Sequence, residues 1–365
     1  MGCSRRSSQS NFHDGFDSTN FGLLVKDVKY ALRTERNNNL TLVDTLQHMG
    51  IEHHFQEEIQ SILQKDVEQS ACFLKYQNHH DISLCFRLLR QEGHHVSADV
   101  FKKFKNNDDG TFGLNLSQDV NGLIGLYEAS QLGVEGEYIL DEIANFSGDH
   151  LNAYLAINDS CDEARIIKEK MKYPYHKSLA SCKAKNFINN FKGINGWGKS
   201  TLQELANMDY SITKEIHQHE LIQVSRWWRS LGLAEELKLL RDQPLKWWEL
   251  CAMMDLPEYM RSTYKDENQE GNDGSYIECY MKGQKNGSIG LAREYVVKQI
   301  EDEWKQVNKK HFDLMNGSLG SFSKASLNLV RMVPLMYNYD DKQSLHVLLE
   351  YINFMLYDNV SMSIK

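Results

Sequence analysis

Residues 40–63 read LTLVDTLQHMGIEHHFQEEIQSIL, and this segment decides the fold class. Its apolar side chains mostly recur at steps of three or four residues, as on one face of an α-helix: Leu42, Leu46, Met49, Phe55, Ile59 and Leu63. Gly50 interrupts the pattern and predicts two helices rather than one. Similar stripes recur further along the chain, at residues 84–89, 120–127, 202–210 and 292–304. Strand-like alternation is nearly absent, so the sequence predicts an all-α protein.

The composition agrees with this prediction and excludes two classes of protein. Only four of the 365 residues are proline, and because proline breaks helix interiors, its scarcity favours long helices. The formal charge of −9 does not suit a nucleic-acid partner. No apolar run approaches the roughly 18 residues of a membrane-spanning helix, so we expect no membrane partner either. The N-terminus lacks the apolar core of a secretory signal, which leaves the plastid and the cytoplasm open.

Residues 191–200, FKGINGWGKS, are the best candidate for a domain boundary. They contain three glycines and follow a stretch rich in Lys and Asn. All six tryptophans lie at or after this loop, which is a marked change in composition. We therefore expect two helical domains, residues 1–190 and residues 191–365.

The same loop matches the phosphate-binding pattern GxxxxGK[ST] at residues 193–200. A true loop of this kind follows a buried parallel strand, whereas the preceding residues 183–192 read KAKNFINNFK. The interpretation that we favour is a connection between domains, with a nucleotide-binding loop as the remote alternative.

Histidine doublets at 53–54, 79–80 and 94–95, and the pair His217 and His219, raise the question of a metal site. Adjacent residues of a helix point about 100° apart, so a doublet does not easily offer two ligands to one ion. Two histidines on one helical face need four-residue spacing, which His217 and His219 lack. Solvated or packed histidines are the interpretation that we favour.

Residues 266–270, DENQE, have the spacing by which carboxylates project from one helical face and bind Mg²⁺. The acidic pairs at 108–109 and 340–341 do not complete the pattern DDxxD. The alternative for DENQE is the solvated first turn of a helix, where acidic side chains suit the helix dipole.

Several longer stretches are more specific than any of these patterns: FHDGF at 12–16, GIEHHFQEEI at 50–59, FRLLRQEG at 86–93, DDGTF at 108–112, PYHKSL at 174–179, HQHEL at 217–221, SRWWRSLGL at 225–233, LPEYM at 256–260 and VPLMYNYD at 333–340. Together they resemble plant class I terpene synthases over almost the whole chain. Residues 266–281 are most similar to producers of acyclic alcohols of the linalool and nerolidol kind.

The resemblance implies an N-terminal α-barrel domain and a C-terminal α-bundle that holds the active site. It also implies a monomer that acts on geranyl or farnesyl diphosphate as a carbon–oxygen lyase, with Mg²⁺ as the cofactor and Mn²⁺ as the alternative. The metal ions stabilise the leaving diphosphate, and aromatic faces stabilise the resulting carbocation. Arg241 matches one arginine of the diphosphate-binding pair, whose partner position holds Gln243.

Two departures from the family pattern bear on activity. The helix that carries DDxxD is missing between Trp247 and Trp248, and a second join lies near residues 264 and 265. We expect a shortened C-terminal domain in which Glu267, with Asp266 and Glu270, is the remaining candidate metal site. Activity is therefore expected to be lost or impaired. The alternatives are a non-catalytic helical protein that binds or regulates a partner, and a splice variant.

Overall fold

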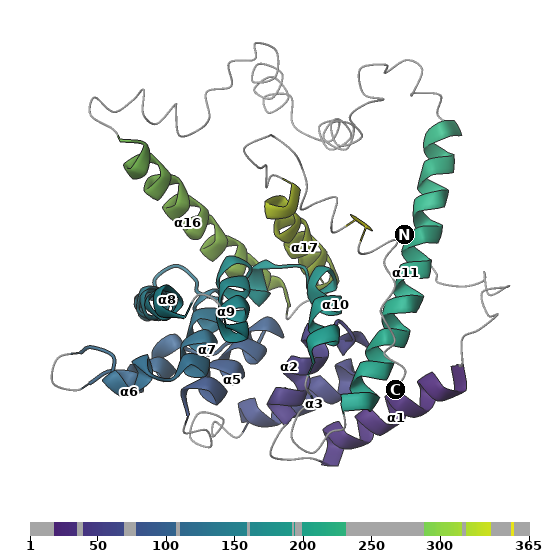
Figure 1. Cartoon of the computed structure of the whole chain (residues 1–365), viewed down its shortest axis with the longest axis horizontal. Coiled ribbons are helices and arrows are strands. Elements are labelled where there is room, and N and C mark those ends of the chain that lie inside the picture. The colour runs from purple at the N-terminus through teal and green to yellow at the C-terminus, as the bar shows by residue number, and fades with distance from the viewer. Residues whose placement is uncertain are drawn as a thin grey trace, which may run out of the picture. The chain divides into compact units, whose positions relative to one another are not determined.

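The computed structural model describes ten segments of the chain: residues 18–34, 39–68, 78–106, 110–158, 161–191, 193, 199–230, 288–315, 319–336 and 352–353. Helices dominate these segments, which confirms the all-α prediction (Figure 1). The one isolated β-bridge of the described segments joins Lys105 and Phe112. None of the helices in those segments combines the length and the apolar character needed to cross a membrane.

The α-helices of the described segments are α1 (Ser18–Thr34), α2 (Asn39–Met49), α3 (Gln56–Glu68), α5 (His79–Gln91), α6 (Leu114–Ser117), α7 (Val120–Ser130), α8 (Tyr138–Ile157), α9 (Asp162–Lys172), α10 (Ala180–Asn190), α11 (Lys199–Ser230), α16 (Ile289–Met315) and α17 (Gly320–Met336). Three 3₁₀ helices accompany them, namely η1 (Glu52–His54), η2 (Ala98–Phe104) and η3 (Tyr175–Lys177).

The chain forms two compact units. The first comprises residues 1–133, 137–213 and 311–365, and the second comprises residues 134–136 and 214–310. α11 and α16 each pass from one unit to the other. The division between residues 190 and 191 concerns the domains of the family rather than these units, and it stays a prediction.

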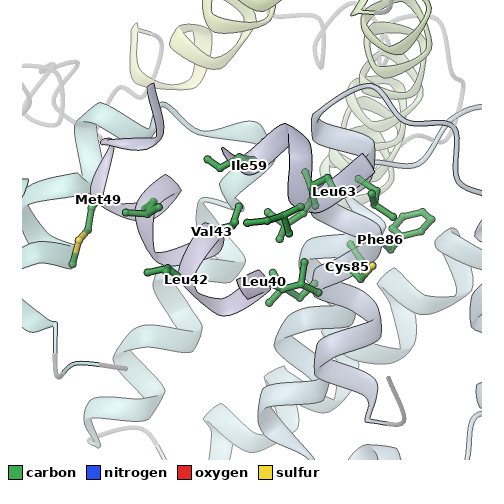
Figure 2. Close-up of a cluster of buried hydrophobic side chains, with 14 of the residues drawn as sticks. Leu40, Leu42, Val43, Met49, Ile59, Leu63, Cys85 and Phe86 are labelled. Atoms are coloured by element: carbon green, nitrogen blue, oxygen red, sulfur yellow. The ribbon is translucent and has the colours of Figure 1, made fainter. Parts of the chain in front are cut away.

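The core of the first unit is built on the segment that opens the sequence analysis. α2 and α3 are separate helices, as Gly50 predicts, because this glycine has φ of +75° and ends the first helix in a conformation that other residues avoid. The apolar face of α2 and α3 packs beside α5, and Figure 2 shows Leu40 beside Cys85 and Leu63 beside Phe86. Burial of this face, rather than helix propensity, stabilises these short helices.

α5 is buried along nearly its whole length, and it begins at an N-cap, where the Asn78 side chain accepts a hydrogen bond from the Asp81 backbone N–H. Two arginines of this helix lie inside the protein. Arg90 donates hydrogen bonds to the carbonyl oxygens of Val96 and Leu132, and it forms an ion pair with Glu137. A buried guanidinium is tolerable only with such partners, so Arg90 ties the ends of two loops to α5.

The second arginine, Arg87, pairs with Asp44 of α2 and lies over the ring of Tyr175, 5.0 Å from its centroid. Burial opposes ionisation of Asp44, but His48 and Arg87 outweigh it and hold the pKa of this carboxyl well below its usual range. Arg331 of α17 donates from Nε to the His176 carbonyl oxygen at 2.7 Å. Polar contacts therefore join α17 to the α2–α5 core.

Candidate functional site

The residues predicted to contact diphosphate and metal lie outside the part of the chain that the structure describes. This holds for Arg241, Asp266, Glu267 and Glu270, and for both joins in the C-terminal domain. Their roles therefore stay predictions. The candidate ligands within the described segments belong to the first unit.

The phosphate-binding pattern ends where a helix begins, because α11 starts at Lys199. The helix before this loop is α10, which ends at Asn190. A phosphate-binding loop needs a buried strand in that position. A helix takes its place in the described residues, but residues 194–198 lie outside them, so the interpretation of residues 191–200 as a connection between domains stays a prediction.

Three potential metal ligands converge on one point of the first unit. His53 and His54 lie on η1 and its turn, and Asp209 lies on α11, 155 residues further along the chain. His54 Nε2 is 2.6 Å from Asp209 Oδ1, and His53 Nε2 is 3.5 Å from the same oxygen. One nitrogen or oxygen from each side chain lies within 4.8 Å of the others. In the described segments this is the only such group of three or more.

His53 and His54 are held in place by different contacts. The ring of His54 meets the edge of Phe21 from α1, with ring centroids 5.3 Å apart. The ring of His53 lies 3.9 Å from that of His54. The prediction that a doublet does not easily offer two ligands is wrong here, because η1 is not an α-helix and both rings turn toward the same carboxylate.

The contacts in this cluster favour the charged forms of both His53 and Asp209. The hydrogen bond to Asp209 raises the pKa of His53. Burial opposes the charge of Asp209, but hydrogen bonds from His53 and His54 outweigh it and lower the pKa of its carboxyl. Asp209 is therefore an ionised carboxylate at neutral pH, with two imidazole nitrogens facing it.

Asp209 occupies a position in the sequence that indicates a buried carboxylate, although no motif singles it out. It stands seven residues after Leu202, so it falls on the apolar face that Leu202, Leu205 and Ala206 form. A carboxylate at a core-facing position needs a partner, because a buried charge without one is costly. The identity of that partner could not be read from spacing, since it lies 155 residues away.

A cavity of about 750 Å³ lies elsewhere in the first unit. Gln56, Gln60, Glu92, Ser321 and Lys324 contribute to its wall, and Met315 is the one apolar side chain that lines it. Lys324 Nζ is 3.8 Å from Glu92 Oε2. A hydrocarbon cation needs apolar and aromatic walls, so this polar cavity does not suit a prenyl chain.

Comparison with known proteins shows what the chain is similar to. Residues 7–173 match the family model described as "Terpene synthase, N-terminal domain". "Probable terpene synthase 4" of Ricinus communis is 30% identical over 510 residues, covering 92% of this chain and 89% of that protein. The chain belongs to the plant terpene synthase family. An alignment over 510 residues contains positions that this terpene synthase, with 365 residues, does not fill.

Other relatives agree with this assignment. The "(E)-nerolidol synthase TPS18VF" of Cannabis sativa is 29% identical over 495 residues, covering 88% of each chain. Among solved structures, a limonene synthase with 2-fluorolinalyl diphosphate aligns with a TM-score of 0.76 at 20% identity, covering 98% of both chains. An isoprene synthase from grey poplar with three Mg²⁺ ions aligns with a TM-score of 0.74 at 20% identity, covering 94% of this chain and 97% of that one. These structures show that the terpene synthase described here has their α-helical fold.

Proposed function

We propose that this protein is a terpene synthase by descent whose ability to ionise a prenyl diphosphate is lost or severely reduced. The ancestral reaction acts on geranyl or farnesyl diphosphate. Its carbon–oxygen bond breaks, diphosphate leaves with the bonding electrons, and water captures the allylic cation. Loss of a proton then gives an acyclic alcohol such as linalool or nerolidol.

The observation that carries this proposal is that Trp248 directly follows Trp247, at the place where the resemblance to the family predicts a DDxxD helix. The gapped alignments to full-length relatives support it, since they extend over more positions than the chain has residues. The isoprene synthase from grey poplar was solved with three Mg²⁺ ions, and oxygen ligands such as carboxylates are what Mg²⁺ prefers.

The residues that we propose for any remaining activity are few. Arg241 offers a guanidinium to the diphosphate, and Glu267, with Asp266 and Glu270, offers carboxylates for a single divalent cation, Mg²⁺ or Mn²⁺. One cation neutralises less of the departing diphosphate's charge than three. We further propose that residues 1–190 and 191–365 are the two family domains, with the second shortened. Chloroplastic relatives support a plastid location, with the cytoplasm as the alternative.

The test is turnover by the purified full chain. We expect no volatile alcohol from geranyl or farnesyl diphosphate with Mg²⁺ or Mn²⁺, when products are analysed by gas chromatography and mass spectrometry. The matched control is the nerolidol synthase relative assayed in the same way. A metal-dependent alcohol that disappears in Glu267→Gln but persists in Glu301→Gln would falsify the proposed loss of activity.

A second candidate function is non-catalytic partner binding, which the surface of two helices favours. In the second unit α11 exposes Ile216, Leu221 and Trp227, and α16 exposes Val297 and Ile300. Apolar faces of this kind commonly mark protein contacts. If the chain acts this way, it forms a discrete complex with an intact synthase in analytical ultracentrifugation. A monomer that ignores the intact synthase contradicts this candidate.

A further inference from the structure

The turn after α2 presents two imidazoles to α11. Gly50, with φ of +75°, sends the chain into a turn, and Ile51 anchors this turn because its side chain is fully buried. The following residues form η1, where His53 and His54 stand side by side. Both histidines are therefore fixed by a buried neighbour rather than carried on a free loop.

A hydrogen bond on the side of the ring away from Asp209 determines which nitrogen of His53 carries the hydrogen. His53 Nδ1 is 3.2 Å from the Gly50 carbonyl oxygen, and because a carbonyl only accepts, Nδ1 carries the hydrogen and donates it. In the neutral ring this leaves a lone pair on Nε2, which faces Asp209. Histidines that bind metals almost always donate their other N–H in this way, often to a backbone carbonyl.

One distance among the three ligand atoms, from His53 Nε2 to Asp209 Oδ1, is already close to that of a tetrahedral metal site. Zinc–ligand bonds of about 2.0–2.2 Å place two ligands of a tetrahedron roughly 3.3–3.6 Å apart. His53 Nε2 and Asp209 Oδ1 are already 3.5 Å apart. His54 Nε2 and Asp209 Oδ1, at 2.6 Å, share a hydrogen bond that an ion must replace. Opening this pair by less than ~1 Å requires only small rotations of the side chains.

We propose that His53, His54 and Asp209 bind a divalent transition-metal ion, with Zn²⁺ as the best fit. Two imidazoles and a carboxylate are ligands that zinc accepts and that Mg²⁺, which prefers oxygen, does not. The half-exposed side chain of His53 leaves the fourth position open to water. The ion fastens the turn after α2 to α11, so its effect is on the stability of the first unit.

The experiment uses the full chain, purified without a histidine tag and stripped of metal. Zn²⁺ is titrated in competition with a chromogenic chelator, and Co²⁺ is titrated while its visible absorption is recorded. We expect one tight site per chain, a Co²⁺ band typical of four-coordination, and a rise of several degrees in the midpoint of thermal unfolding. A large excess of Mg²⁺ should not compete.

Variants assign the site to its residues. His53→Ala, His54→Ala and Asp209→Asn should each weaken Zn²⁺ binding about tenfold or more. The matched controls are His79→Ala and His80→Ala, because this second doublet divides its contacts between two acids, Asp119 and Asp81. These controls should bind Zn²⁺ as the wild type does.

Two results would overturn the proposal. One is a wild-type chain that binds Zn²⁺ no more tightly than His53→Ala, whose fold is verified by circular dichroism. The other is equal loss in the His79→Ala and His53→Ala variants, which would indicate scattered surface binding. If the variants fail to fold, the metal-dependent unfolding midpoint and the Co²⁺ spectrum of the wild type still decide between binding and its absence. None of these readouts depends on turnover of a prenyl diphosphate.

Discussion

The two parts of α11 lie in different environments, and the difference shows what an apolar helical face needs in order to be buried. In the first unit α11 buries Leu202, Leu205 and Ala206 completely or nearly so. In the second unit the same helix leaves Leu221 and Trp227 44% and 54% exposed. Both parts have apolar residues at helical spacing. Periodicity therefore predicts an apolar face, but burial requires helices that pack against it.

The largest expected effect comes from one substitution made in each part of α11. Leu205→Ala should cost about 2–5 kcal/mol of unfolding free energy, because it leaves a cavity in a packed core. Leu221→Ala should cost less than about 0.5 kcal/mol, because the side chain is largely in water already. Urea denaturation followed by circular dichroism measures both. Equal costs would abolish the contrast between the two parts of the helix.

A buried ion pair should matter more than an exposed one. Arg90→Met leaves the Glu137 carboxylate and two carbonyl oxygens without their donor, and we expect a loss of roughly 3 kcal/mol. The control is Lys102→Met, since Lys102 and Asp99 form a pair whose side chains are 62% and 65% exposed. It should change stability by less than about 0.5 kcal/mol. A large loss for Lys102→Met would contradict this view.

Acid should weaken the contact between His311 of α16 and the neighbouring helix α17. Burial, with the charges of Arg331 and Lys324, lowers the pKa of His311 to about 4. The unfolded chain binds this proton near pH 6.5, so the stabilising contribution is complete above that pH and is lost as the pH falls toward 4. At about 1.4 kcal/mol per pH unit, the interval from 6.5 to 4 corresponds to a loss on the order of 3 kcal/mol.

The measurement for His311 is the difference between two stability profiles. Unfolding free energies of the wild type and of His311→Gln are compared between pH 7 and pH 4. The wild type should lose more stability than the variant in this window, and the difference isolates His311 from the other acidic groups. Parallel profiles would show that His311 titrates normally.

The smallest expected effect concerns two glycines on the first unit. Gly50→Ala should cost about 1 kcal/mol, because φ of +75° disfavours any side chain even though Ala184 leaves enough space. Gly22 lies inside α1, and no atom lies within 4 Å of the methyl group that Gly22→Ala would add. This substitution should therefore stabilise the protein by roughly 0.5–1 kcal/mol. Thermal unfolding gives both signs. A stabilising Gly50→Ala would mean that the turn before η1 tolerates ordinary residues.

The sequence predicts what local chemistry determines. The break at Gly50 and the helices on either side of it follow from spacing and glycine. The burial of Arg87 and Arg90 does not, because their acidic partners lie 43 and 47 residues away. Spacing alone treats His53 and His54 as neighbours on one helix. Their third ligand, Asp209, is brought to them by tertiary packing alone.

We propose that this chain keeps the family fold but has lost ionisation. The most direct test measures the release of inorganic diphosphate from geranyl diphosphate in the presence of Mg²⁺. This readout reports carbon–oxygen cleavage whatever terpene follows. We expect release no faster than in the absence of protein, from a chain whose helical signal and cooperative unfolding show that it is folded. Release at the rate of the nerolidol synthase relative would contradict it, and would mean that the carboxylates near Glu267 rebuild a working metal site.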